Sequence, residues 1–139
     1  MSTIVLDASV AVKLVSQEYD SDIAVDRVAS ASAIIAPDWI MIEVLHALWK
    51  KDHASPDALE TANAAVAALT QIIDRIVPAR ELVSDALIMS HALPHPIYDC
   101  LYLALARIEN AVVLTADAKF ASVVEKEGRG LEVERLEAQ

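Results

Sequence analysis

The chain has 139 residues, and 21 Asp and Glu against 11 Lys and Arg give a formal net charge of −10. This length fits one domain, expected here to span residues 1–139. Hydrophobic residues make up 55% of the chain but aromatic residues only 4%, so a folded core must be mainly aliphatic. The two Gly exclude a collagen-like chain, and the single Cys excludes an intramolecular disulfide framework.

Charge and hydropathy also limit the function. An acidic chain is poorly suited to hold a phosphate backbone in a basic groove, although a bound metal ion can supply positive charge locally. The first apolar run stops at Asp7. This run, Ile4 to Leu6, is shorter than the roughly 7–15 apolar residues of a signal peptide and the roughly 20 of a membrane span. We therefore expect a cytoplasmic protein without a membrane partner.

Hydrophobic periodicity predicts alternating strands and helices. A strand at 3–6 is followed by helices at 8–15 and 21–32, and a strand at 33–36 by helices at 38–52 and 55–71. A third strand at 75–77 precedes helices at 79–91 and 98–109, a fourth at 111–115 precedes a helix at 117–127, and an edge strand at 131–136 closes the chain. This alternation predicts an α/β fold with three layers, α/β/α, around a mostly parallel sheet of about five short strands.

Four acidic residues stand out because no Lys or Arg lies three or four positions away to form a helical ion pair. Asp7 and Asp117 follow the first and fourth strands, Asp99 opens an apolar helix, and Glu43 is the only charged residue between positions 39 and 49. Residues that leave parallel strands at the same edge of a sheet can approach one another. We therefore expect the four side chains to converge there.

Each acid also has a purely structural interpretation. Asp7, Asp99 and Asp117 precede helical stretches and could act only as N-caps. Glu43 lies within a helix, where a buried carboxylate needs a cation, a distant partner such as Arg, or a raised pKa. For each residue taken alone, both interpretations stay open.

Taken together, the four acids favour a metal site. Converging carboxylates repel one another unless a cation lies among them. Oxygen ligands favour a hard ion, Mg²⁺ or Mn²⁺, rather than zinc. One or two such ions, completed by waters and a substrate phosphate, are the usual arrangement for phosphoryl chemistry.

Four motifs occur in order along most of the chain. They are Val-Leu-Asp-Ala-Ser at 5–9, Pro37 followed by Glu43, Tyr-Asp-Cys-Leu-Tyr-Leu-Ala-Leu-Ala at 98–106, and Leu-Thr-Ala-Asp-Ala-Lys-Phe at 114–120. This ordered set resembles the PIN domain family. In size and motif spacing it is similar to the VapC-type ribonuclease toxins of bacterial toxin–antitoxin modules.

The resemblance implies a PIN-like fold and metal-dependent hydrolysis of RNA phosphodiester bonds. It also implies a homodimer and a small cognate antitoxin as partner. The family's acidic metal-site positions fall on Asp7, Glu43, Asp99 and Asp117, and its supporting hydroxyl positions on Ser9 and Thr115. One departure is His46, where members often carry Asn.

Two other functions stay open. A receiver-like or phosphatase-like domain would use Asp7 as the phosphorylated residue. A receiver, however, needs paired acids after the first strand, and a haloacid-dehalogenase-like enzyme needs an acid where Ser9 stands. A catalytically silent PIN-like module would only bind a partner, and the four acids argue against it.

Several other polar or aromatic residues are not assigned to the site. His91 and His95 flank a Pro-rich kink and are expected to face water. Cys100 is expected to be a buried, inert thiol. Trp39 and Trp49 are predicted to be core or interface residues.

Overall fold

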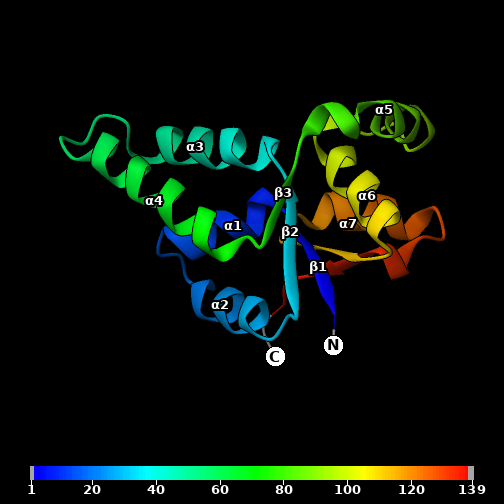
Figure 1. Cartoon of the computed structure of the whole chain (residues 1–139), viewed down its shortest axis with the longest axis horizontal. Coiled ribbons are helices and arrows are strands. Elements are labelled where there is room, and N and C mark those ends of the chain that lie inside the picture. Colours follow the sequence, from blue (N-terminus) through cyan, green and yellow to red (C-terminus); the bar gives the residue numbers. More distant parts are fainter. Residues whose placement is uncertain (1, 138–139) are drawn as a thin grey trace.

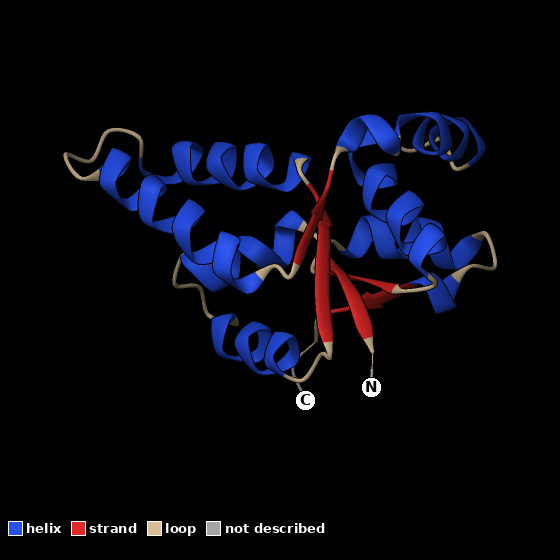
Figure 2. Ribbon diagram, in the orientation of Figure 1, coloured by secondary structure: helices blue, strands red, loops and turns tan. Residues whose placement is uncertain are grey.

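The computed structural model describes residues 2–137 and contains a five-stranded sheet between two layers of helices (Figure 1, Figure 2). All described pairings are parallel, and the strand order is β3-β2-β1-β4-β5. The predicted three-layer α/β/α architecture is confirmed. The strands are β1 (Thr3–Leu6), β2 (Ala33–Pro37), β3 (Arg75–Val77), β4 (Val112–Thr115) and β5 (Val133–Arg135).

The helices divide between the two faces of the sheet in chain order (Figure 1). One face carries α1 (Ala8–Val15), α2 (Ser21–Ala29), α3 (Trp39–Asp52) and α4 (Ala58–Ile72), and the other carries α5 (Val83–Ala92), α6 (Ile97–Glu109) and α7 (Ala118–Lys126). Helices α3 and α4 form a hairpin that extends beyond the sheet. No helix of the described part of the chain has the length and apolar character needed to cross a bilayer.

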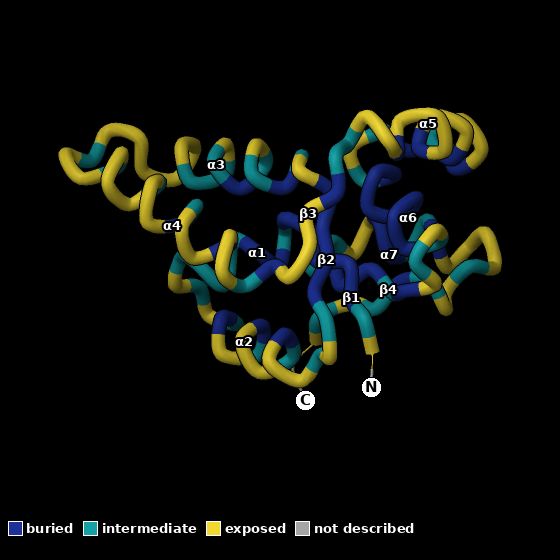
Figure 3. The backbone as a smooth tube through the Cα atoms, viewed as in Figure 1, coloured by how far each residue is buried: buried dark blue, intermediate teal, exposed yellow. Residues whose placement is uncertain are grey.

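The core is aliphatic and centred on β1, β4 and α6 (Figure 3). Central parallel strands are apolar on both sides because helices cover both faces of the sheet. Helix α6 packs against β1, β2 and β4, and its residues 100–106 are all buried. Tyr102 and Phe120 are the largest fully buried side chains of the described residues.

Some predicted boundaries differ from the structure. The helix expected from Ser55 begins at Ala58, because Ser55 Oγ bonds to Asp57 Oδ1 at 2.5 Å and the first three residues form a turn. The stretch 79–91 divides at Leu82 into a 3₁₀ turn and α5. The last strand is shorter than predicted, because residues Gly130–Glu132 form a 3₁₀ turn before it.

Candidate active site

The strand order reverses between β1 and β4, which are parallel neighbours. Connections that leave two such strands run to opposite faces and open a crevice, where α/β sheets place their ligands. Asp7 directly follows β1, and its N–H donates to the carbonyl of Leu114 in β4 at 3.1 Å. Asp117 lies two residues beyond β4. Both acids therefore leave the same edge of the sheet.

Asp7 is buried, with 4% exposure, and two hydroxyl groups hold it. Its Oδ2 accepts hydrogen bonds from Ser9 Oγ at 2.5 Å and from Thr115 Oγ1 at 2.8 Å. Each hydroxyl in turn accepts a backbone N–H, that of Ala116 on Ser9 at 2.9 Å and that of Asp117 on Thr115 at 3.0 Å. A hydroxyl has a single hydrogen to donate, and both are used on Asp7. The network therefore fixes this carboxylate in one orientation.

Glu43 projects from α3 and is half-buried. Tyr102 Oη donates a hydrogen bond to Glu43 Oε1 at 2.6 Å. None of the ion pairs among the described residues involves Glu43. Its partner is therefore a buried phenol and not the distant Arg that the sequence left open.

Asp99 lies in the first turn of α6, and Pro96 takes the N-cap position, so Asp99 is not a cap. Asp99 Oδ2 accepts a hydrogen bond from His95 Nε2 at 2.6 Å. The prediction that His95 faces water is wrong: its exposure is 7%, and its ring packs on Phe120 with centroids 5.2 Å apart. The hydrogen bond to Asp99 replaces the hydration that the His95 imidazole loses on burial, so the Pro-rich kink at residues 94–96 can pack inward. His91 is exposed, as predicted.

Asp117 is an N-cap as well as a pocket residue. Its Oδ1 accepts the N–H groups of Lys119 at 3.0 Å and Phe120 at 3.1 Å at the start of α7. Asp7 occupies the equivalent position before α1, but its side chain makes no capping bond. Capping therefore explains part of the role of Asp117 and does not explain Asp7.

All four acids line one pocket of about 220 Å³ at the carboxyl edge of the sheet. A water molecule takes up roughly 30 Å³ in the liquid, so the space suits an ion with several waters or a phosphate group. The remaining lining residues are small or apolar, apart from one hydroxyl. They are Ala8, Ser9, Val12 and Ala47.

The four carboxylates share a pattern of hydrogen bonding. Each engages one oxygen in the contacts described above, and the other oxygen has no hydrogen-bond partner among the described residues. None of these second oxygens is sealed from solvent, because no carboxylate is found among the buried unpaired atoms of the described chain. The atoms left for a ligand are Asp7 Oδ1, Glu43 Oε2, Asp99 Oδ1 and Asp117 Oδ2.

Burial and the charges of neighbouring acids raise the pKa values of Asp7, Glu43 and Asp99. Burial, with the charges of Asp99 and Asp117, raises the pKa of Asp7 to about 6 against the opposing effect of its hydroxyl donors. Burial, with the charges of Asp7 and Asp99, raises the pKa of Glu43 to about 7. The pKa of Asp99 is raised chiefly by burial, although His95 opposes the change. The acids thus act on one another, and a cation among them would relieve the repulsion.

The donor chemistry of the pocket fits a hard divalent cation, because every available ligand atom is a carboxylate oxygen. Within residues 2–137, no three acid, His or Cys side chains are already drawn together around a single point. The acids surround the pocket and face one space. Their role as metal ligands stays a prediction.

Two residues that support the acids, Tyr102 and His95, do not belong to the predicted site. Tyr102 is part of an apolar motif, and His95 was expected to face water. Each lies three or four positions from Asp99, a spacing that brings side chains together along a helix. A polar side chain three or four positions from Asp99, within an otherwise apolar stretch, is the sequence feature that indicates such a supporting residue.

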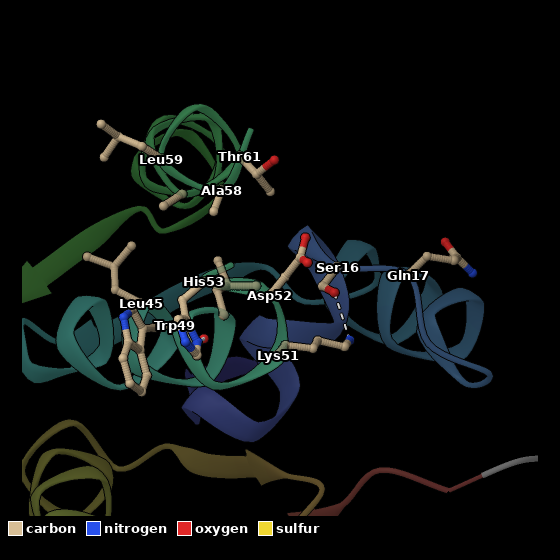
Figure 4. A pocket seen from close by; sticks show the side chains of 12 residues that line it. Ser16, Gln17, Leu45, Trp49, Lys51, Asp52, His53, Ala58, Leu59 and Thr61 are labelled. Atoms are coloured by element: carbon tan, nitrogen blue, oxygen red, sulfur yellow. Dashed lines mark hydrogen bonds between the residues drawn. The ribbon is translucent and has the colours of Figure 1, made fainter. Parts of the chain in front are cut away.

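A larger groove of about 660 Å³ lies between the end of α1 and the α3–α4 hairpin (Figure 4). Its lining is mostly apolar and includes Leu45, Leu48 and Leu59. Trp49 is 57% exposed here and stacks on His53 with ring centroids 4.2 Å apart, so it is not a core residue. None of the four acids lines this groove, which therefore suits a contact with another molecule rather than chemistry.

Comparison with known proteins gives one family. Residues 4–126 match the family described as PIN domain. No curated protein sequence matches the chain.

Several solved structures share the fold. VapC20 of Mycobacterium tuberculosis, described as a sarcin–ricin loop cleaving toxin, aligns with a TM-score of 0.68 and 18% identity over 86% of this chain and 93% of that one. A toxin–antitoxin complex from Klebsiella pneumoniae gives 0.71 and 14% over 98% and 99%. VapBC2 of Rickettsia felis, bound to a promoter DNA fragment, gives 0.66 and 14% over 97% and 99%. At these identities the likeness establishes the fold.

Proposed function

The chain belongs to the PIN domain family, and we propose that this member is a metal-dependent ribonuclease, the toxin of a toxin–antitoxin pair. One observation carries the proposal. Four carboxylates line a single pocket, and each keeps one oxygen without a protein hydrogen bond. The fold shared with VapC20 and with a toxin–antitoxin complex supports it.

We propose that Mg²⁺, or Mn²⁺, binds as one or two ions to Asp7, Glu43, Asp99 and Asp117. When bound, the metal supplies positive charge that polarises the phosphodiester and activates a water for hydrolysis. Burial first, and then the charges of the crowded neighbouring carboxylates, raise the pKa of Asp7 to about 6 and that of Glu43 to about 7. That crowding supports a cation as the natural occupant.

The chain's own residues hold the ligand oxygens in place. Ser9 and Thr115 turn Asp7 so that Oδ1 faces the pocket, and Tyr102 does the same for Glu43 Oε2. Hydrogen bonds to ligand carboxylates fix their orientation before a ligand arrives and keep the cost of reorganisation low. Because the chain carries a net charge of −10, RNA would be attracted locally through the metal rather than through the overall field.

An antitoxin is the partner we propose for the groove between α1 and the α3–α4 hairpin. Its apolar lining suits the apolar face of an amphipathic helix. The Klebsiella structure, which aligns with nearly the whole chain, is a toxin–antitoxin complex. A segment anchored in the groove could extend an Arg or Lys to the acidic pocket, where charge-assisted hydrogen bonds would block the site.

For the homodimer, we propose a contact through the outer face of α5. Val83, Leu87 and Ile88 are large aliphatic side chains there with 44%, 48% and 68% exposure. Helices α3 and α5 both lie along the upper edge of the molecule in Figure 1. On α3, Ile42 is 53% exposed. A soluble monomer seldom leaves such a patch uncovered. A second copy of the same patch would cover it symmetrically.

The sequence left other functions open: a receiver domain, a phosphatase-like enzyme and a silent binding module. Receiver-type domains have strand order 2-1-3-4-5, whereas β2 here lies between β1 and β3, so the receiver alternative is wrong. A phosphatase-like use of Asp7 would need an acid at position 9, where the hydroxyl of Ser9 instead donates to Asp7. A silent binding module remains the competing proposal, and an activity assay separates it from a ribonuclease.

The test is cleavage of a long structured RNA by purified protein, first stripped of metal by a chelator and then supplied with Mn²⁺ or Mg²⁺. The proposal predicts cleavage with metal, none without it, and none from Asp7→Asn in either condition. Mn²⁺ binding is measured in parallel by calorimetry. A protein that binds no Mn²⁺, or an Asp7→Asn variant that cleaves like the parent, would overturn the proposal.

A further inference from the structure

The backbone of His95 is held by two hydrogen bonds. Its N–H donates to the Ser90 carbonyl at 3.1 Å, and Ser90 Oγ donates back to the His95 carbonyl at 2.6 Å. Pro94 and Pro96 on either side further restrict the backbone. A residue whose backbone is anchored in this way has less backbone freedom to lose when its side chain binds a partner.

The anchored ring contacts two parts of the acidic pocket. Its Nε2 lies 2.6 Å from Asp99 Oδ2, and its face packs on Phe120 with centroids 5.2 Å apart. The Phe120 N–H caps onto Asp117 Oδ1 at 3.1 Å. His95 therefore joins the Asp99 carboxylate to the start of the helix that Asp117 caps.

We propose that His95 is a positioning residue that turns Asp99 so that Oδ1 alone faces the pocket. The last side-chain torsion angle of Asp has a broad distribution with roughly two-fold symmetry. Without a hydrogen-bond donor, the Asp99 carboxylate can therefore rotate and present either oxygen, or both, to the pocket. A donor on Oδ2 selects one orientation and keeps that oxygen from the ligand. This inference rests on the proposed metal site and adds a residue that the four-acid set does not contain.

Hydrogen bonds of this kind measurably affect metal binding. Removal of such a supporting partner typically weakens metal affinity by roughly 10–100-fold. His95→Leu removes the donor and retains an apolar contact with Phe120, whereas His95→Gln retains an N–H donor at the end of a side chain of similar reach. We expect the Leu variant to bind Mn²⁺ about 10–100-fold more weakly than the parent. The Gln variant should recover most of that loss.

A packing control separates positioning from general stability. Phe120→Leu leaves the His95–Asp99 hydrogen bond but removes the ring contact, so it should lower the melting temperature and leave Mn²⁺ affinity near the parental value. The readouts are Mn²⁺ titration calorimetry, thermal unfolding without metal, and cleavage rate against metal concentration. In the Leu variant, saturating Mn²⁺ should restore the cleavage rate.

The outcomes distinguish this inference from the proposed function. Parental Mn²⁺ affinity in a folded His95→Leu variant would overturn the positioning role and leave the ribonuclease proposal intact. Failure of the parent itself to bind Mn²⁺ would overturn both. If His95→Leu does not fold, the comparison of Mn²⁺ affinity between His95→Gln and Phe120→Leu tests the positioning role instead. Weaker Mn²⁺ binding in the control than in the Gln variant would show that packing and not the hydrogen bond matters.

Discussion

Tyr102 donates its phenolic hydrogen to Glu43 at 2.6 Å, and this contact joins the two helical layers beyond the end of the sheet. Tyr102 belongs to α6 and Glu43 to α3, which cover opposite faces (Figure 1). Burial raises the pKa of Tyr102 above its ordinary value, and the charges of Asp7 and Glu43 raise it further. The phenol therefore stays protonated and acts only as a donor to Glu43 at physiological pH.

Tyr102→Phe should weaken metal binding in a pH-dependent way. The hydrogen bond lowers the pKa of Glu43, so its loss raises that pKa further above about 7. At pH 7 more of Glu43 is then protonated, and we expect Mn²⁺ affinity to fall about 10-fold. At pH 8.5 the gap between variant and parent should narrow, because Glu43 is ionised in both.

Tyr98→Phe is the matched control for this measurement. Tyr98 lies on the same helix, is 52% exposed, and stacks on Trp39 with ring centroids 5.6 Å apart. Its hydroxyl is not bonded to any of the four acids. Equal losses of Mn²⁺ affinity in the two variants would show that the Tyr102 hydroxyl has no special role.

Asp7→Asn should stabilise the metal-free protein. The amide oxygen can accept the Ser9 and Thr115 hydrogen bonds that now reach Oδ2, while a negative charge leaves a crowded, buried site. The pKa of Asp7 is raised from 3.8 to about 6. A shift of that size corresponds to a gain on the order of 1–3 kcal/mol in the free energy of unfolding at pH 8. Urea unfolding with a chelator present measures it, and an unchanged midpoint would speak against a strained carboxylate.

The stability of the metal-free parent should rise as the pH falls. The folded pKa values of Asp7 and Glu43, about 6 and about 7, exceed their ordinary values of 3.8 and 4.5. The folded chain then binds protons more tightly than the unfolded chain, so the gain is absent above pH 7 and grows through the interval down to about pH 4.5. Urea midpoints from pH 8 to pH 5 test this. The slope should be smaller in Asp7→Asn, and a fall in stability over that range would contradict the assignment.

A charge on α5 should disrupt the homodimer that we propose. Ile88 is 68% exposed, the most of the three aliphatic side chains of α5 that we propose as the contact. Ile88→Lys would bring two like charges together across a symmetric contact, which costs free energy at every encounter. Sedimentation at micromolar concentration should show a dimer for the parent and a monomer for the variant. Ile108→Lys, an exposed change on α6, is the control.

The groove makes a separate prediction for the antitoxin. Leu59 is 77% exposed and lines the apolar groove beside Trp49. Leu59→Glu should weaken capture of a co-expressed cognate antitoxin by 10-fold or more, because a charge would be buried against an apolar helix. RNA cleavage by the free variant should equal that of the parent. A complex of unchanged affinity would place the antitoxin elsewhere.

Local sequence was enough to predict most of the fold and the convergence of the four acids on one pocket. Short apolar runs that end at Asp7 and before Asp117 marked β1 and β4, and the strand edge that they share follows from parallel pairing. The apolar stretch 98–109 predicted a buried helix, and α6 is one. These features depend on spacing within about ten residues, which a single sequence displays directly.

The missed features depend on contacts between distant parts of the chain. His95 is buried because Phe120, 25 positions later, supplies a ring for it to pack on. The phenol that satisfies Glu43 is 59 positions away. Helix α6 is apolar on nearly every side, so its sequence did not indicate which side faces the pocket. Only the packing of three layers determines these partners.

The pairing of β1 with β4 also determines when the pocket can exist during synthesis. Val5 and Val113 are paired partners in the centre of the sheet, so β1 lacks one neighbour until the ribosome has made most of the chain. Closing a loop of that length costs about 4 kcal/mol of chain entropy, which is recovered only when β4 docks. Thr115 and Asp117 arrive with the same strand. A nascent or truncated chain that ends before these residues can form, at best, the part of the sheet made by β1, β2 and β3. The acids that it already contains are then not brought together around a pocket. The chemistry of the pocket therefore begins only after β4 has been synthesised and has docked.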